Sequence, residues 1–326
     1  MKKLVKGIKA FTALFLLVII SFLIYYKGSI LLLLDISRDL KDSNKSIETL
    51  GVLTEYEASN SMEVKHLKYK NTKSKEVFLD LYLSNNNTKA SPVLIYVHGG
   101  SWIYGDNTIP IGLEPIINAF NNRGFTIISL SYELLDDSNI DLKDPITDVK
   151  DAIRWVYKNK DEYNFDTNDI GLLGVSSGAH LSLMAAYTDD ESFKGDNSLS
   201  NYSSKIKYVI DIFGPTDLST LDFSELSLNN RKIKKLINSN EELDKYSPIN
   251  YVTDKSPDTL IIHSIEDDLV PYKNSEELYD NLLSSSINAK LITFSQGSHF
   301  FSDFNINEVY IAIIKVLNFL TSNTSL

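Results

Sequence analysis

Residues 170–187, IGLLGVSSGAHLSLMAAY, decide the fold of this chain. Their apolar start is typical of a short buried strand, and their second half is rich in helix formers. Between the two lies a G-x-S-x-G pentapeptide with Ser176 at its centre. In this pattern the central serine lies on a strained strand-to-helix turn, and the helix N-terminus behind it stabilises negative charge. We therefore predict that Ser176 is a nucleophile. Ser177, outside the motif register, is expected to offer its backbone N–H instead.

From residue 63 onward, short apolar runs alternate with helical patterns. Asp144-Pro145 is typical of a helix start. Asn274 with Glu277 resembles a capping pair that opens another helix. Such alternation predicts an α/β fold, with a mostly parallel central sheet that carries helices on both faces. The expected strands cover residues 63–69, 76–83, 92–97, 125–130, 170–174, 206–212, 259–262 and 289–294.

Composition excludes several classes of protein. The 326 residues are 43% hydrophobic and 23% charged, which is typical of a packed globular protein. There are no cysteines, so disulfides, thiolate metal sites and a cysteine nucleophile are excluded. The formal net charge of −11 disfavours binding to a nucleic-acid backbone. The sequence leaves the oligomeric state open.

The N-terminal segment has the pattern of a membrane anchor. Four lysines precede an apolar run of 17 residues, Ala10–Tyr26, which at ~1.5 Å rise per residue comes close to the thickness of a bilayer core. Positive charge ahead of the run predicts a cytoplasmic N-terminus and a remainder outside the cell membrane. The alternative is a cleaved signal peptide and a secreted protein. The bulky residues 30–34 disfavour it, because they offer no small-x-small cleavage site.

We expect an anchor or signal segment at 1–34, a polar stalk at 35–62, and one large domain with the candidate nucleophile at 63–326. Two polar stretches, 188–204 and 216–256, follow the serine motif. Active-site loops of parallel sheets gather at the carboxyl edge, so we expect both stretches near that edge, as lids over the site.

A nucleophilic serine needs a base, and the chain has five histidines. A flexible loop at the carboxyl edge of the sheet is needed to bring an imidazole over Ser176. His299, in QGSHF directly after the last predicted strand, lies on such a loop, so we predict that it is the base. The remaining histidines are expected in strands, in a helix or in a glycine loop: His66, His98, His180 and His263.

The carboxylate that orients this base should follow a buried strand between the serine and the histidine. The segment HSIEDDLVP, residues 263–271, provides three acids there. Asp267 is favoured, because it precedes Val-Pro in a D-x-x-V-P arrangement. Asp268 is its nearest competitor, and Glu266 is a more distant alternative.

Residues 98–102, HGGSW, follow another predicted strand. Glycines without side chains let backbone N–H groups face the oxyanion of a tetrahedral intermediate. We expect the amides of Gly99, Gly100 and Ser177 to form this oxyanion hole. Trp102 is a candidate wall of the substrate pocket, although an aromatic ring packed under a loop is equally ordinary.

The order HGG, G-x-S-x-G, Asp and His along the chain matches that of α/β-hydrolases. From about residue 63 to the C-terminus, the chain resembles bacterial carboxylesterases, feruloyl-esterase-like and hormone-sensitive-lipase-like members of that superfamily. Relatives typically have glycine where this chain has Ser101 and Ser264. The matching segments are LDLYL, YVHGGSWIYGD, DVKDAIRWV, IGLLGVSSGAHLSL, FGPTDL, YSPINYV, HSIEDDLVP and GSHF.

This resemblance implies an α/β-hydrolase fold and a serine esterase that cleaves small-molecule carboxylic esters, often short acyl esters or acylated sugars. It implies a triad of Ser176, His299 and Asp267 and requires no metal or organic cofactor. An amidase, a peptidase or an acyltransferase remains open, since the same triad serves all of them. A non-catalytic binding protein is less expected, because all three triad residues are present.

Overall fold

The computed structural model describes residues 64–72, 75–84, 89–110, 114–135, 140–222, 240–299 and 305–324. The predicted anchor, residues 1–34, and the predicted stalk, residues 35–62, lie outside this part of the chain. Across the described ranges, no helix is both long enough and apolar enough to cross a bilayer.

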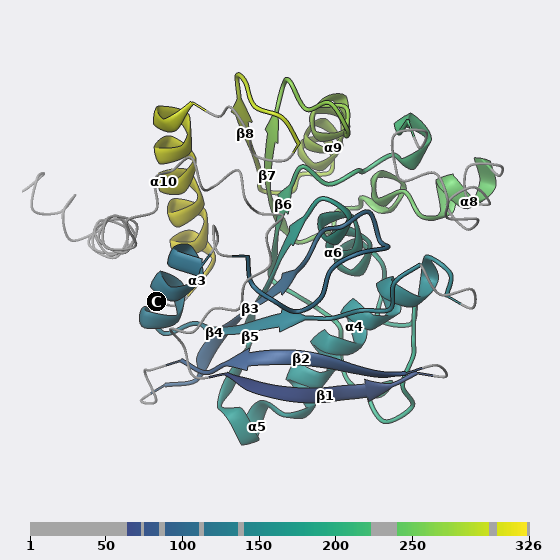
Figure 1. The fold of residues 1–326 in the computed structure, drawn as a ribbon, viewed down its shortest axis with the longest axis vertical. Helices are drawn as coiled ribbons and strands as arrows, with labels where there is room; N and C mark the ends of the chain where they lie inside the picture. Colours follow the sequence, from purple (N-terminus) through teal and green to yellow (C-terminus); the bar gives the residue numbers. More distant parts are fainter. Residues whose placement is uncertain are drawn as a thin grey trace, which may run out of the picture.

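One eight-stranded sheet forms the centre of the molecule (Figure 1). Its strands are β1 (Lys65–Asn71), β2 (Glu76–Tyr82), β3 (Ser91–Val97), β4 (Thr126–Leu130), β5 (Phe165–Val175), β6 (Tyr208–Ile212), β7 (Asp258–Ser264) and β8 (Ala289–Phe294). They lie in the order β1-β2-β4-β3-β5-β6-β7-β8. Strand β2 is antiparallel to both of its neighbours, and the strands from β4 to β8 are parallel to one another. The predicted mostly parallel sheet is therefore confirmed.

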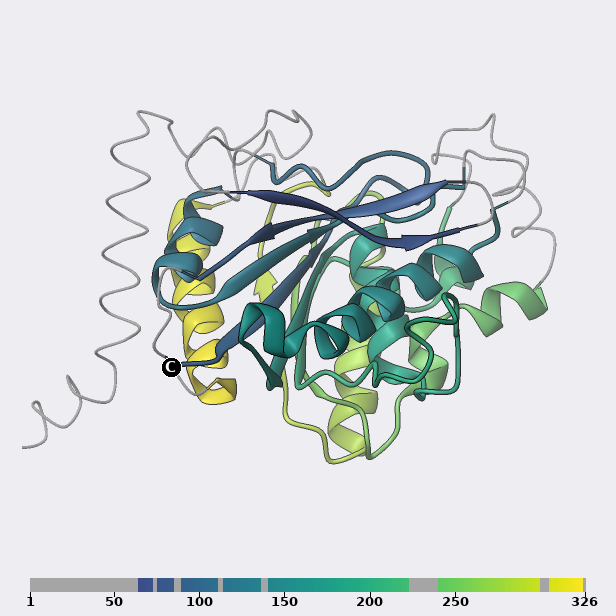
Figure 2. The ribbon, with the colours of Figure 1, turned by 90° about the horizontal axis from the view of Figure 1, so that it is seen from below.

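Helices cover both faces of the sheet, as strands buried on two sides require. The helices are α3 (Glu114–Asn122), α4 (Lys143–Lys158), α5 (Lys160–Tyr163), α6 (Ser177–Tyr187), α8 (Asn240–Lys245), α9 (Lys273–Ser284) and α10 (Ile306–Asn323), with the short 3-10 helices η2 (Leu218–Thr220) and η3 (Pro248–Tyr251). Helices α4, α6 and α9 pack on one face, and α3 and α10 pack on the other (Figure 2).

The core is divided by the sheet into two apolar clusters. Successive residues of a strand point to opposite faces, so neighbouring residues join different clusters. Leu94 and Ile127 pack toward α3 and α10, whereas Ile95 and Ile128 pack toward α4, α6 and α9. All four side chains are fully buried. This two-sided burial explains why the parallel strands are continuous apolar runs in the sequence.

The parallel strands end at one common edge, and the loops that follow them carry the candidate site residues. HGGSW follows β3, Ser176 follows β5, the acid-rich loop follows β7, and His299 lies after β8. Only β6 separates β5 from β7 in the sheet. Residues far apart in the sequence are therefore brought to one edge by the strand order.

Two predicted local features differ from the structure. Strand β5 begins at Phe165 instead of residue 170, because the polar residues at its half-exposed start conceal it in the sequence. The predicted cap at Asn274 is wrong, since α9 begins at Lys273. The buried Asn274 side chain instead accepts hydrogen bonds from the backbone N–H groups of Thr216 and Asp217, each at 2.8 Å, and so binds the chain after β6 to α9.

The first predicted lid, residues 188–204, packs along α4. The buried guanidinium of Arg154 donates to the carbonyl of Asp190 at 2.9 Å, and the buried ammonium of Lys150 donates to the carbonyl of Thr188 at 3.1 Å. Buried cations need such oxygen partners. The expected role of this segment as a lid stays a prediction.

The second predicted lid, residues 216–256, is described except for 223–239. The N–H of Ile249 donates to the carbonyl of Thr216 at 3.1 Å, so the two described ends of the segment pack together beyond the end of β6. Its role as a lid stays a prediction.

Two buried tyrosines provide a test of the hydrogen bonding in this core. The hydroxyl of Tyr208 has no partner among the described residues, whereas the hydroxyl of Tyr187 lies 3.0 Å from Thr259 Oγ1. We expect Tyr208→Phe to leave the free energy of unfolding unchanged or to raise it by up to about 1 kcal/mol, and Tyr187→Phe to lower it by about 1 kcal/mol. Denaturant unfolding of both variants checks this. An equal loss in the two would contradict it.

Candidate active site

The turn between β5 and α6 holds Ser176 in a strained conformation, with φ of 54° and ψ of −122°. A non-glycine residue with positive φ costs energy and persists only where its surroundings fix it. Here the N–H of Ser176 donates to the carbonyl of Ile212 at 2.9 Å. Its carbonyl accepts from Ala179 and His180 in the first turn of α6. The predicted strand–turn–helix context of the serine is present.

The two motif glycines are required by packing. A Cβ atom at Gly174 would lie 2.4 Å from Ala179 Cα, and one at Gly178 would lie 2.2 Å from the carbonyl oxygen of Val97. Both distances are far below van der Waals contact, so neither position admits a larger residue without movement of the backbone. The glycines allow α6 to begin directly against β5 and β3.

Ser176, His299 and Asp267 form one hydrogen-bonded chain. Ser176 Oγ lies 2.8 Å from Nε2 of His299, and Nδ1 of His299 lies 2.7 Å from Oδ2 of Asp267. The ring of His299 is 5% exposed and meets the edge of Phe213 at a centroid distance of 4.7 Å. The structure thus brings together the three residues that the sequence analysis selected.

Among the three acids of the loop, only Asp267 contacts the imidazole. Its Oδ1 accepts from the N–H groups of Leu269 and Val270, at 2.9 and 2.8 Å. Burial alone would raise the pKa of Asp267, but hydrogen bonds from the two histidines that meet it and from a backbone N–H hold that pKa well below its usual range. Asp267 is therefore ionised at neutral pH. Asp268 accepts only the backbone N–H of His299, at 3.3 Å, and Glu266 is exposed.

The glycine loop after β3 lies against the nucleophile turn. A Cβ atom at Gly99 would lie 3.3 Å from Ser176 Cβ. Within the described part of the chain, the amides of Gly99, Gly100 and Ser177 have no hydrogen-bond acceptor. They are therefore available to an oxyanion beside Ser176. The hydroxyl of Ser177 is buried, which disfavours this residue as the nucleophile.

Ser101 stands in this loop where the resembling esterases typically have a glycine. It adopts φ of 52°, a left-handed conformation that glycine reaches without a Cβ clash. Ser101 therefore holds this backbone conformation at the cost of strain that a glycine would not have.

A family model matches residues 79–282, which is more than half of the chain. The chain belongs to the BD-FAE family. Esterase LipC of Mycobacterium tuberculosis is 28% identical over 205 residues, 61% of this chain and 50% of that protein. Isoprenylcysteine alpha-carbonyl methylesterase ICME of Arabidopsis thaliana is 27% identical over 234 residues, 68% of this chain and 53% of that protein. The chain spans about half the length of these curated relatives.

Solved structures with the same fold include a truncated carbohydrate esterase from gut microbiota. It matches with a TM-score of 0.64 and 25% identity, over 82% of this chain and 99% of that chain. An esterase of Thermogutta terrifontis, Est2, matches with a TM-score of 0.67 and 21% identity, over 81% of this chain and 94% of that chain. The predicted α/β-hydrolase fold and the resemblance to serine esterases are confirmed.

Trp102 does not have the exposure expected of a pocket wall in this BD-FAE member. Its side chain is only 3% exposed, and its indole N–H donates to Nδ1 of His180 at 3.1 Å. Nε2 of His180 in turn lies 2.7 Å from the carbonyl of Tyr246. The aromatic ring therefore packs under the glycine loop and links it to α6 and to the chain after α8. Contact of Trp102 with a substrate stays a prediction.

Four histidines of this BD-FAE chain lie outside the relay from Ser176 to Asp267. The side chains of three of them, His66, His98 and His180, make no hydrogen bond with this relay among the described residues. Burial lowers the pKa of His98 and of His180 to about 4, so both rings are neutral at physiological pH. The ring of His98 stacks on Tyr132 at a centroid distance of 4.2 Å, which braces the glycine loop. His66 lies on β1 and contacts Asp80 of β2.

Sequence reasoning missed two residues that contact this relay, His263 and Phe213. His263 meets Asp267, and Phe213 meets the ring of His299. Both belong to segments that resemble the family, HSIEDDLVP and FGPTDL. The spacing of His263 four residues before Asp267, across a strand end, was the available signal. No comparable signal existed for Phe213.

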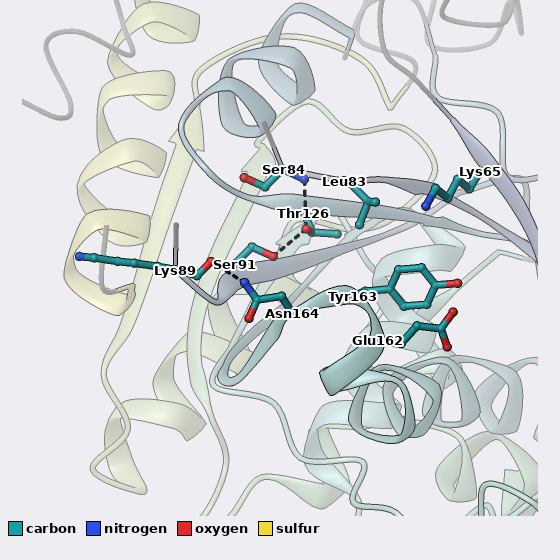
Figure 3. A pocket seen from close by; sticks show the side chains of 9 residues that line it. All are labelled: Lys65, Leu83, Ser84, Lys89, Ser91, Thr126, Glu162, Tyr163 and Asn164. Carbon is teal, nitrogen blue, oxygen red and sulfur yellow. Dashed lines mark hydrogen bonds between the residues drawn. The ribbon is translucent and has the colours of Figure 1, made fainter. Parts of the chain in front are cut away.

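A separate hollow of about 390 Å³ lies at the opposite edge of the sheet (Figure 3). Its polar groups bond one another: Ser91 Oγ lies 2.7 Å from Thr126 Oγ1, and Asn164 Nδ2 donates to the carbonyl of Lys89 at 2.9 Å. In the same described residues, no group of three His, Asp or Glu side chains is arranged to hold a metal ion.

Asp211 of β6 is a buried carboxyl near the turn that carries Ser176, and its titration can be tested. It is fully buried, and burial raises its pKa to about 7, although the Gly214 N–H and nearby His263 oppose the shift. A carboxyl whose folded pKa is raised contributes stability below its unfolded pKa, near 4, and loses this contribution as the pH rises through about 7.

Asp211→Asn removes this titration while keeping the shape of the side chain. We expect the variant to gain stability relative to the parent between pH 5 and pH 8. Denaturant unfolding of both proteins at the two pH values measures the difference. Parallel pH dependence in the two proteins would show that Asp211 does not titrate in this range.

Proposed function

We propose that this protein is a serine carboxylic-ester hydrolase that works through an acyl-enzyme on Ser176. The observation that carries the proposal is the continuous chain of hydrogen bonds from Ser176 Oγ through His299 to Asp267. A hydroxyl bonded to an imidazole, which is itself bonded to a buried carboxylate, is the arrangement that activates a serine for acyl transfer. The esterase names of its relatives agree with this reaction.

In the first half-reaction, Nε2 of His299 takes the proton of Ser176 as Oγ attacks the ester carbonyl. Asp267 accepts the Nδ1–H of His299 and stabilises the imidazolium that forms. The tetrahedral intermediate collapses, the ester C–O bond breaks, and the leaving alkoxide takes the proton from Nε2. In the second half-reaction, water gives a proton to Nε2 and attacks the acyl carbon. The bond between that carbon and Oγ then breaks, Nε2 returns its proton to Oγ, and the carboxylic acid leaves.

The oxyanion of each tetrahedral intermediate is proposed to bind the amides of Gly99, Gly100 and Ser177. Two features support this assignment: the contact of Gly99 with Ser176, and the absence of other acceptors for these amides in the described residues. Fixed N–H donors aimed at developing charge are worth about 3 kcal/mol each in transition-state stabilisation.

We propose short-chain or carbohydrate-linked esters as substrates. The similarity to a carbohydrate esterase from gut microbiota supports the second class. Amides, peptides and acyl transfer to another alcohol are the alternative reactions, since the same triad serves them. We also propose that residues 1–34 hold the hydrolase domain outside the cell membrane, because lysines precede the apolar run Ala10–Tyr26.

Substitution of the nucleophile tests the proposed reaction. We expect Ser176→Ala to lower turnover of p-nitrophenyl acetate by about 10⁴-fold or more and to abolish labelling by a fluorophosphonate probe. Ser177→Ala is the matched variant and should still be labelled. Anilide and peptide analogues, assayed with the parent protein, separate esterase from amidase activity. Full turnover by Ser176→Ala would exclude this residue as the nucleophile.

Two neighbouring carboxylates allow a matched test of the triad acid. We expect Asp267→Asn to lower kcat by about 10³- to 10⁴-fold, because the amide no longer stabilises the imidazolium of His299. Asp268→Asn should cost less than about tenfold, since its remaining oxygen still accepts the His299 backbone N–H. Steady-state kinetics of both variants give the comparison. A larger loss in Asp268→Asn would contradict the assignment.

A further inference from the structure

The hydrogen-bonded chain continues beyond Asp267 to a second histidine. Nε2 of His263 lies 3.1 Å from Oδ2 of Asp267, the same oxygen that lies 2.7 Å from Nδ1 of His299. On the other side of the ring, Nδ1 of His263 lies 2.6 Å from Ser275 Oγ in the first turn of α9. Both His263 and Ser275 are fully buried. The chain therefore has five members, from Ser275 through two histidines to Ser176.

The partners of His263 fix which ring nitrogen carries the proton. Nε2 faces two oxygens, Oδ2 of Asp267 and the carbonyl of Val270, each at 3.1 Å. Only a proton on Nε2 lets the ring bond them. Nδ1 then accepts the hydroxyl proton of Ser275, which completes the hydrogen bonding of a neutral ring.

The carboxylate of Asp267 is restrained on both oxygens as a result. Oδ1 accepts two backbone N–H groups of its own loop, and Oδ2 accepts one N–H from each histidine. A carboxylate with four donors has no freedom to rotate. Without the donor of His263, Oδ2 would be held by His299 alone, and only the two backbone N–H groups at Oδ1 would oppose rotation of the carboxylate.

We propose that His263 is a positioning residue, which holds the shared oxygen of Asp267 at the bonding distance of His299. This inference rests on the proposed esterase function. The N–H of His263 also draws charge away from Oδ2, so that His299 gives up its proton to the leaving alcohol more readily. Two further titratable groups face His263: Asp211 from β6, and Tyr272, whose ring edge lies at a centroid distance of 5.7 Å.

A matched pair of substitutions separates positioning from packing. The amide of His263→Gln reaches the place of Nε2 and keeps a donor for Asp267. His263→Asn keeps a polar group near Ser275 but falls short of Asp267. We expect kcat for p-nitrophenyl acetate to fall about 10- to 100-fold in His263→Asn, with KM changed less than about twofold, and to be largely restored in His263→Gln.

The pH profile gives a readout that a packing role would not move. In His263→Asn the full charge of Asp267 acts on His299, so the acidic limb of kcat/KM should move to higher pH. In His263→Gln the acidic limb of kcat/KM should lie at the same pH as in the parent protein. Equal kcat and equal pH profiles in parent and His263→Asn would overturn the inference and leave the esterase function intact. A parent protein that turns over no ester would overturn the proposed function instead.

Ser275→Ala covers the case in which His263→Asn does not fold, as judged by its thermal unfolding. This variant removes the hydroxyl that bonds Nδ1 of His263 and holds the far side of the ring, and it leaves the contact between His263 and Asp267 in place. We expect a several-fold loss of kcat at unchanged KM. If His263→Asn does not fold, unchanged kcat in Ser275→Ala together with a His263→Gln variant whose kcat falls about 10- to 100-fold below that of the parent would overturn the inference.

Discussion

The close packing of β3, β5 and α6 around Ser176 is the constraint on which the site depends. Helix α6 begins so near the two strands that any side chain at Gly174 or Gly178 would overlap backbone atoms. This packing holds Ser176 at positive φ and fixes its hydroxyl above the carboxyl edge of the sheet. The same approach brings Gly99 against Ser176, so that the candidate nucleophile and the candidate oxyanion amides share one rigid support.

Charge at the site is controlled by burial and by hydrogen bonding to one carboxylate. The hydrogen bonds to Asp267 keep its pKa low despite burial, so a negative charge is held next to His299. Burial lowers the pKa of His98 and of His180, so these two rings are neutral. These two rings brace the loops around the site, and the ionised carboxylate bonds two histidines and two backbone N–H groups of its own loop.

The meeting of Ser176, His299 and Asp267 was more readable from the sequence than the packing around them. The motif around Ser176 and the strand–loop position of His299 were readable because they depend on local turn geometry and on strand order. Asp267 was favoured over Asp268 because Asp267 fits the D-x-x-V-P arrangement. Nothing in the sequence indicated that Trp102 packs against His180 of α6 or that the segment 188–204 packs along α4, because such contacts depend on which helix surface a segment meets. No local pattern encodes such a choice.

The sequence by itself determined the alternation of strands and helices and the glycines that a strained serine turn needs. It also determined the order in which nucleophile, acid and base follow the chain. Only the tertiary structure decided which groups meet: the 2.7 Å contact that selects Asp267, the ring of Phe213 against His299, and the approach of His263 from the same strand end. The physical reason is that turn geometry and periodicity act over a few residues, whereas hydrogen bonds between loops depend on the sheet that places their ends side by side.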